Sequence, residues 1–405
     1  MNKFIPGVTP VKTGGKVYDN HEIDNLIDCA REFWLTSGRY EKEFCSKLSK
    51  FLHTKFVLTT NSGTSANLLT MSTIAKTKAE VITVATGFPT TIAPIVQCNM
   101  TPVFVDIDLG TYNVNIGALK KAITKKTAAI FLAHTMGFPF NIDEVLEICH
   151  EKDLCLIEDN CDALGAKFKG KYTGTFGVMG TLSFYPAHHI TTGEGGAVVT
   201  DSLWVKNQIQ SYRDWGRDCQ CDTGQDNKCG KRFKQQFGKL PLGYDHKYVF
   251  SHLGYNMKMT DMQAAIGAAQ VDKLQYIIDS RQANFLMLYE IFKEYEKYFI
   301  LQNVIENSEP SPFGFVLTVK DDASFKRNDI VNFLEKNLIQ TRMLFAGNMV
   351  KQPCMENVKY KVSGKLTNTD KIMNNTFWIG LHPNVTDDMI NYIGFKMKNF
   401  MEFYV

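Results

Sequence analysis

No stretch of the 405-residue sequence approaches the roughly 18 consecutive apolar residues that mark a membrane-spanning helix. The first twenty residues also lack the basic start and apolar core of a secretion signal. Neither sign of charge dominates, since 45 lysines and arginines stand against 42 aspartates and glutamates, and no basic block or stripe occurs. We therefore expect a cytoplasmic protein that binds neither membranes nor nucleic acid. Its ten cysteines would then stay reduced, available for packing or for a metal.

What the sequence does contain is a regular alternation of short apolar runs and helix-like stretches between residues 80 and 200. The runs are VITVA, TPVFVDI, AAIFLAH, LCLIED, TLSFY and AVVT. This rhythm predicts parallel strands joined by crossover helices, and hence an α/β sheet that is buried on both faces. Ligands of such sheets collect at the carboxyl ends of the strands.

The second half of the chain predicts a smaller α+β unit. Apolar residues at helical spacing from Met259 to Tyr298 favour one long helix. After it come a strand-like GFVLTV, a helix over 327–336, a strand-like QTRMLF and a helix from Thr386 to Tyr404 with a Thr-Asp-Asp start. With 405 residues the chain exceeds the usual size of one domain. We expect a large domain over 1–270 and a small one over 271–405, with the N-terminal segment able to pack on the small domain.

Two motifs point to a bound phosphorylated ring. NSGTSAN, from Asn61 to Asn67, follows an apolar run and precedes a helix, so its small residues and free N–H groups suit a phosphate, although an ordinary helix cap uses the same residues. Asp159 in CLIEDNCDALGA ends a buried strand, where a carboxylate can hold a protonated pyridine nitrogen. The alternative is an aspartate that only caps the following turn.

These motifs carry a resemblance to a known family. NSGTSAN, TGFPTT, EDNCDALG, SFYPAHHITTGEGG and LGYNMKMTDMQAAIG follow in the order and spacing of the DegT/DnrJ/EryC1/StrS sugar aminotransferases. The resemblance implies the type I pyridoxal-phosphate fold, with a mainly parallel seven-stranded sheet covered by helices and a smaller C-terminal α+β domain. The cofactor, pyridoxal or pyridoxamine 5'-phosphate, would be bound by Gly63, Thr64, Phe88, Asp159, Asp162, Ser183 and Asn256.

The resemblance also implies separate roles for these residues. Gly63, Thr64 and Ser183 would bind the phosphate. Phe88 would stack on the ring, and Asp159 would pair with its nitrogen. In the family, the asparagine at the position of Asn256 reaches the phosphate of the neighbouring subunit, which implies a homodimer. The next position but one usually holds arginine, and this chain has Lys258 there.

His188 occupies the position of the family's reactive lysine in the SFxxxK motif. An imidazole cannot condense with the cofactor aldehyde as lysine does, but it can accept and donate a proton near neutral pH. The substitution therefore predicts non-covalently held pyridoxamine phosphate. It also predicts loss of the hydroxyl at carbon 3 of a 4-keto sugar in place of amine transfer. His188 is preferred over the adjacent His189 on register, and loss of activity is the competing interpretation.

Three further cysteines lie close together in the loop-like RDWGRDCQCDTGQDNKCGKRF. Cys219, Cys221 and Cys229 lack the paired spacing of structural zinc sites, yet clustered thiols favour a soft metal. With Cys161 they give C-x57-C-x-C-x7-C, which resembles the iron–sulfur CDP-6-deoxy-L-threo-D-glycero-4-hexulose 3-dehydrase subgroup. That resemblance implies a [2Fe-2S] cluster held by the four thiols, with zinc as the alternative.

The subgroup implies reductive removal of the carbon 3 hydroxyl from a CDP-linked 4-keto-6-deoxyhexose in 3,6-dideoxysugar synthesis for a surface polysaccharide. Electrons would come from an NADH-dependent flavin and iron–sulfur reductase. Two alternatives stay open: a cluster-free 3-dehydratase of the colitose type, which would use an amino donor such as glutamate, and a non-catalytic binding protein. Arg342 in TRMLFAGN could meet the substrate diphosphate or form a surface ion pair. His246 and His252 receive no role.

Overall fold

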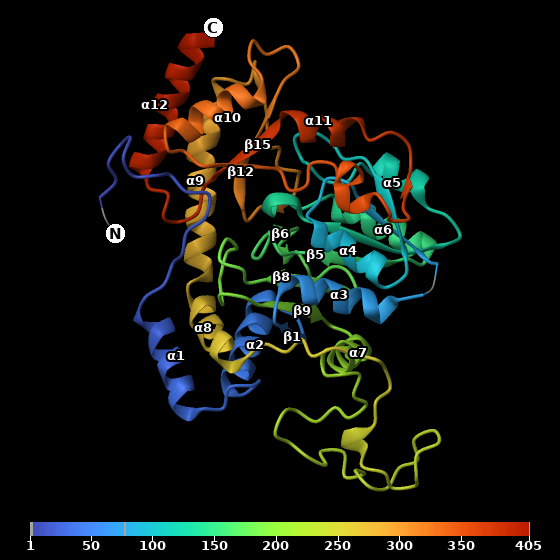
Figure 1. The fold of residues 1–405 in the computed structure, drawn as a ribbon. Coiled ribbons are helices and arrows are strands. Elements are labelled where there is room, and N and C mark those ends of the chain that lie inside the picture. The colour runs from blue at the N-terminus through green and yellow to red at the C-terminus, as the bar shows by residue number, and fades with distance from the viewer. Residues whose placement is uncertain (1–2, 77, 405) are drawn as a thin grey trace.

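The computed structural model describes residues 3–76 and 78–404 and is built around one large mixed sheet (Figure 1). Its strands are β1 (Phe56–Thr60), β2 (Glu80–Val84), β3 (Thr101–Val105), β4 (Thr127–Ala133), β5 (Cys155–Asp159), β8 (Met179–Ser183), β9 (Gly196–Thr200) and β14 (Lys361–Val362). They lie in the order β1-β9-β8-β5-β4-β2-β3-β14, and β9 is antiparallel to both of its neighbours while the other pairs are parallel. The predicted α/β fold is confirmed, and the two-residue β14 adds an eighth strand to the seven expected.

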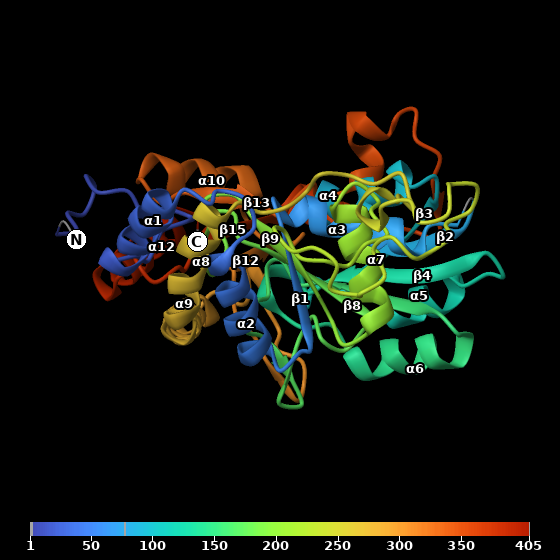
Figure 2. The same cartoon turned by 90° about the horizontal axis from the view of Figure 1, so that it is seen from below.

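The helices of this region cover both faces of the sheet (Figure 2). They are α1 (Asn20–Glu32), α2 (Arg39–Leu52), α3 (Gly63–Ile74), α4 (Pro89–Gln97), α5 (Ile116–Ala122), η1 (Thr135–Gly137), α6 (Ile142–Lys152), α7 (Leu203–Arg213) and α8 (Asp261–Asp272). Successive strand residues point to opposite faces. In β4, Ala129 and Phe131 join the core under α3, α4 and α7, whereas Ile130 and Leu132 join the core under α5 and α6. Burial on both faces explains why these strands read as continuous apolar runs.

A second, antiparallel sheet forms in the C-terminal part. It contains β10 (Phe299–Leu301), β12 (Gly314–Val319), β13 (Thr341–Met343) and β15 (Thr376–Gly380), in the order β10-β12-β15-β13. The surrounding helices are α9 (Leu274–Lys293), α10 (Arg327–Lys336), η3 (Met349–Lys351), η4 (Pro353–Met355), α11 (Thr367–Asn375) and α12 (Asp387–Tyr404). Val11 pairs with Ile339 beside this sheet. The domain boundary at residue 270 stays a prediction.

The single long helix expected over 259–298 is wrong, because the chain forms α8 and α9 with a break at Lys273. The Lys273 ammonium binds Glu22 Oε1 at 2.7 Å and Asp19 Oδ1 at 3.3 Å, so α1 holds the residue at the junction. Local periodicity cannot predict this contact, because it joins residues some 250 positions apart in the chain.

The segment from Asp214 to Thr260 forms an arm that projects from the body below α7 (Figure 1). Its one short helix is η2 (His246–Tyr248). The remaining small sheet, β11-β6-β7, consists of β6 (Lys167–Phe168), β7 (Lys171–Tyr172) and β11 (Ser308–Glu309). Within residues 3–76 and 78–404, no helix combines the length and apolarity needed to cross a bilayer.

Candidate active site

The predicted phosphate cradle forms where β1 leads into α3. Ser62 is the N-cap of α3, and its hydroxyl accepts a hydrogen bond from the Ser65 N–H. A Cβ atom at Gly63 would lie 2.6 Å from Ser183 Cβ and 3.2 Å from Cys161 Sγ, so only glycine lets these three segments meet. Thr64 is exposed at the same helix start. The structure thus brings Gly63, Thr64 and Ser183 together, beside free helix N–H groups that suit an anion.

Asp159 lies at the carboxyl end of β5, beside this cradle. Its Oδ2 accepts hydrogen bonds from Asn67 Nδ2 at 2.9 Å and Thr91 Oγ1 at 2.7 Å, and Oδ1 accepts one from the Cys161 N–H at 3.2 Å. The carboxylate is therefore fixed by α3, α4 and its own turn. Oδ1 keeps a second lone pair, which suits a protonated ring nitrogen.

Phe88 presents an exposed aromatic ring at the start of α4. It is the N-cap residue of that helix and is 55% exposed. Its ring meets Phe345 edge to face, with centroids 6.2 Å apart. Asn67 Nδ2 also donates to the Thr90 carbonyl, which links this turn to Asp159. Asn67 therefore links the turn that carries Phe88, the ring expected to stack on the cofactor, to Asp159, the expected partner of the ring nitrogen.

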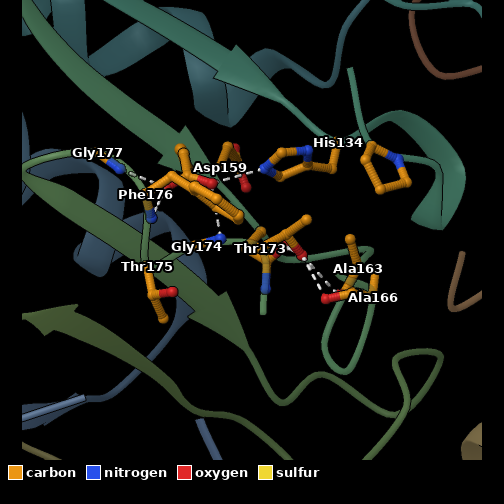
Figure 3. A network of polar contacts seen from close by, with 12 residues as sticks. His134, Asp159, Ala163, Ala166, Thr173, Gly174, Thr175, Phe176 and Gly177 are labelled. Carbon is orange, nitrogen blue, oxygen red and sulfur yellow. Dashed lines mark hydrogen bonds and ion pairs between the residues drawn. The ribbon is translucent and has the colours of Figure 1, made fainter. Parts of the chain in front are cut away.

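Beneath Asp159, the adjacent Glu158 forms a fully buried network. Its carboxylate accepts hydrogen bonds from the N–H groups of Gly174, Phe176 and Gly177 and contacts His134 Nε2 at 2.9 Å (Figure 3). The His134 ring stacks on Phe140 with centroids 4.3 Å apart. Buried carboxylates are tolerated only with such a complete set of partners. The network fixes the end of β5 and therefore the position of Asp159.

Replacing Glu158 by glutamine should lower the free energy of unfolding by about 3 kcal/mol. The amide keeps the shape but removes the charge, and it places an NH₂ group against backbone N–H donors. Urea unfolding of the wild type and the variant would measure the difference. A matched control is Glu309→Gln, which removes an exposed carboxylate and should change stability by less than about 0.5 kcal/mol. Equal stability of the Glu158 variant and the wild type would contradict the role of this network.

His188 lies close to Asp162, with 3.5 Å between Nδ1 and Oδ1, although the geometry does not make this contact a hydrogen bond. Burial lowers the pKa of His188 to about 4, and the charge of Asp159 opposes that shift. Burial, together with Asp159, raises the pKa of Asp162 to about 8. The short distance favours a charged pair, whereas burial favours a neutral one. The imidazole is neutral, because one contact of 3.5 Å does not offset the hydration that the charged ring would lose on burial. His188 can therefore accept a proton at pH 7.

Not every predicted residue lies at this centre. Asn256 is exposed at the base of the arm, where its Oδ1 accepts a hydrogen bond from Lys258 Nζ at 2.8 Å. Lys258 Nζ also lies 3.5 Å from the centroid of the Trp215 ring. Arg342 is exposed on β13 and donates to the Thr341 carbonyl beside it. Within the described part of the chain, no contact joins Asn256 or Arg342 to Asp159 or His188.

The four predicted metal ligands are not brought together. Cys219, Cys221 and Cys229 line a small cavity in the arm with His246, and Cys161 is absent from its lining. Cys161 instead lies against Gly63, and burial raises the pKa of its thiol well above the usual range. Across residues 3–76 and 78–404, no group of three or more His, Cys, Asp or Glu side chains has a geometry that could hold a metal ion.

Four residues of the site were not singled out from the sequence. Asn67 and Thr91 lie within the quoted motifs NSGTSAN and TGFPTT, so their positions beside Asp159 had a local signal. Phe313, whose ring centroid is 5.3 Å from that of His188, and the buried Arg281 come from the C-terminal half. Nothing in their local sequence marks them.

The residues present fit a phosphorylated pyridine. The Gly63 cradle and the start of α3 offer donors for a phosphate, and Asp159 offers an oriented carboxylate. Two hydroxyls of the sheet region, Thr86 Oγ1 just after β2 and Thr181 Oγ1 within β8, are buried without a hydrogen-bond partner in the structure. A site with one anion cradle, one carboxylate and one exposed aromatic ring matches the three parts of pyridoxal phosphate.

Comparison with known proteins agrees with this fit. The model of the DegT/DnrJ/EryC1/StrS aminotransferase family matches residues 16–398. The lipopolysaccharide biosynthesis protein RfbH of Salmonella typhimurium is 48% identical over 98% of this chain and 93% of its own. A dTDP-4-dehydro-2,6-dideoxy-D-glucose 3-dehydratase of Saccharopolyspora spinosa is 46% identical over 98% and 88%. The structure of E. coli GDP-4-keto-6-deoxy-D-mannose-3-dehydratase with bound hydrated PLP superposes with a TM-score of 0.87 and 30% identity, covering 95% of this chain and 98% of that one.

The prediction of a [2Fe-2S] cluster is wrong on these findings. The solved 3-dehydratase relative holds hydrated pyridoxal phosphate. In this chain Cys161 belongs to the wall of the phosphate cradle, while the other three thiols lie in the arm. Sequence spacing had placed four thiols in one ligand set, but spacing along a chain does not fix distance in space. The cofactor prediction is therefore reduced to pyridoxal or pyridoxamine phosphate.

Proposed function

This chain belongs to the DegT/DnrJ/EryC1/StrS aminotransferase family, and from that premise we propose that it is a 3-dehydratase of nucleotide-linked 4-keto-6-deoxyhexoses that uses pyridoxamine phosphate. The observation that carries the proposal is His188. A largely buried, neutral imidazole stands where the family's aminotransferases carry lysine, close to the residues that fit the cofactor. The 3-dehydratase relatives support the same substrate class.

Bound pyridoxamine phosphate would supply an amine that condenses with the 4-keto group and a ring that accepts electrons. Asp159 would hold the proton on the ring nitrogen, because its Oδ1 has a free lone pair and its Oδ2 is fixed by Asn67 and Thr91. His188 accepts a proton on an imidazole nitrogen. A histidine cannot complete amine transfer as lysine does, so loss of the carbon 3 hydroxyl becomes the outcome.

For the nucleotide, we place CDP first. The subgroup that the sequence resembles acts on a CDP-linked sugar, and this is the support for the choice. The names of two relatives contain dTDP- and GDP-linked sugars, and these two nucleotides are therefore tested beside CDP. Arg342 stays the proposed partner of the diphosphate, on the ground that a guanidinium matches phosphate oxygens.

Glutamate is our proposed source of the reducing equivalents. With the cluster withdrawn, a flavin and iron–sulfur reductase would have no electron acceptor in the chain, so that partner is not part of the proposal. One glutamate would give its amine to the cofactor and leave as 2-oxoglutarate. The amine would then leave as ammonium when the deoxygenated sugar is released. The two-electron oxidation of glutamate balances the removal of one oxygen from the sugar.

We propose a homodimer as the active form. The arm exposes large apolar side chains, with Leu253 99% and Leu242 78% exposed, and such surfaces favour association. Asn256 lies in the same segment, in line with its family role at a neighbouring subunit's phosphate. Sedimentation of the holoenzyme tests this assembly.

The experiment that tests the function uses ¹⁵N-glutamate. Protein loaded with pyridoxal phosphate would receive ¹⁵N-glutamate and the CDP-, dTDP- or GDP-linked 4-keto-6-deoxyhexose. We expect a 3-deoxy-4-keto product with the label released as ¹⁵N-ammonium, one for each 2-oxoglutarate, as read by NMR and mass spectrometry. Label retained in the sugar would show an aminotransferase, and failure with all three nucleotides would contradict the proposed substrate class.

A further inference from the structure

Arg281 of α9 is a buried cation without a carboxylate partner. It is 1% exposed, and within the described residues no carboxylate oxygen lies within 4.0 Å of its guanidinium. Its contacts are backbone carbonyls: Nη1 donates to Phe313 at 2.9 Å and to Pro312 at 3.2 Å, and Nη2 donates to Ala187 at 3.3 Å. Nε has no hydrogen-bond partner. Burying a charge in this way costs stability, so the position calls for a compensating role.

The carbonyls that Arg281 holds belong to the surroundings of His188. Ala187 directly precedes His188, and the ring of Phe313 lies against the imidazole at 5.3 Å between centroids. The guanidinium carbon also lies 5.8 Å from the centroid of the Phe313 ring. One side chain of the C-terminal half therefore ties together the loop after β8 and the segment that enters β12. Both segments border the imidazole.

The charge of Arg281 also acts on the imidazole of His188. The titratable residues that face it are Asp162 after β5, His188 and His189 after β8, and His382 after β15. Burial is the main cause of the lowered pKa values of the three histidines, and the Arg281 charge adds to it in each case. At His188 the Asp159 carboxylate acts in the opposite direction, and of the two charges it has the larger effect on the pKa. Burial lowers the pKa of Arg281 itself to about 10, so it stays charged at neutral pH. A cation at this place opposes a second positive charge on His188.

We propose that Arg281 is a positioning residue for His188: its guanidinium holds the carbonyls of Ala187 and Phe313, and so fixes the two segments against which the imidazole lies. The inference rests on the proposed function, because it assigns the support of that function's base. It also assigns a use to a buried cation whose hydrogen bonds all go to backbone carbonyls. Substitutions of Arg281 can separate its hydrogen bonds to the two carbonyls from its positive charge.

The test follows the titration of His188 in the holoenzyme. Protein loaded with pyridoxamine phosphate and labelled with ¹³C at histidine Cε1 would be titrated by NMR, with His188→Asn assigning the signal. We expect His188 to stay neutral down to about pH 5 in the wild type. In Arg281→Met its midpoint should rise by about one pH unit. In Arg281→Lys, which keeps the charge, the midpoint should stay within about 0.3 units of the wild type.

Turnover tests the positioning role by itself, because Arg281→Lys keeps the positive charge but loses the hydrogen bonds. Both Arg281 variants should lose about 100-fold in kcat with little change in KM, because the imidazole is no longer held in place. Asn284→Leu is the matched control: Asn284 lies on the same helix, is buried, and donates to the carbonyls of Leu381, His382 and Val385. It should reduce stability without moving the His188 midpoint.

An unchanged midpoint and kcat in Arg281→Met would overturn the inference. So would a shift of equal size in the Asn284 control. Because the titration needs no turnover, an inactive wild-type protein would count against the proposed function and leave the titration to decide the role of Arg281.

Discussion

Replacing His188 by asparagine is expected to lower the rate of sugar dehydration by about 10³-fold while leaving the binding of pyridoxamine phosphate unchanged. Asparagine has a similar reach but no nitrogen that accepts a proton at neutral pH. Burial keeps the wild-type imidazole neutral, with its pKa lowered to about 4, so the variant removes a competent base. Single-turnover formation of the 3-deoxy sugar would give the rate, and equilibrium dialysis would give the cofactor affinity.

The adjacent histidine provides the control. His189 is buried, and its Nε2 lies 3.0 Å from the Ser311 carbonyl, so its contact is structural. His189→Asn should lose less than about tenfold in rate, with some loss of stability from the disturbed hydrogen bond. If the His189 variant were the inactive one, or if His188→Asn kept its turnover, the choice made on register would be wrong.

The sequence predicted the parts of the site that depend on local pattern. Asp159 was singled out because it ends an apolar run, where ligands of α/β sheets lie, and the structure places it at the end of β5. Gly63 was singled out because small residues before a helix suit a phosphate, and the structure places it at the start of α3. The strands were found because burial on both faces leaves an uninterrupted apolar run, as in β4. In each case the residues that determine the structure are neighbours in the chain.

The failures have a common physical cause. The break between α8 and α9 depends on Lys273 meeting Glu22, and α9 gives no sign that Arg281 turns toward the loop of His188. The four cysteines match a spacing, yet β5 places Cys161 in the cradle while the arm carries the others away from it. Contacts between distant segments decide these cases, and a spacing along the chain does not contain them.

Replacing Asp159 by asparagine should weaken the binding of pyridoxamine phosphate by about 10²- to 10³-fold. An oriented carboxylate next to a protonated ring nitrogen is a buried charge pair, and removal of one partner typically costs 2–5 kcal/mol. The neutral amide cannot hold the proton on the ring, so the ring also becomes a poorer electron acceptor and dehydration slows further. Isothermal titration with pyridoxamine phosphate measures the first effect without any turnover.

Thr91→Val is the matched control for this prediction, because it removes one hydrogen bond to Oδ2 and keeps the carboxylate. We expect a loss of affinity of about tenfold or less, in line with a single hydrogen bond to a charged group. The ratio between the two variants therefore separates the charge of Asp159 from its orientation. Affinities of Asp159→Asn and the wild type within about threefold would mean that the carboxylate only caps the turn after β5, and the assignment of the ring nitrogen's partner would fall with it.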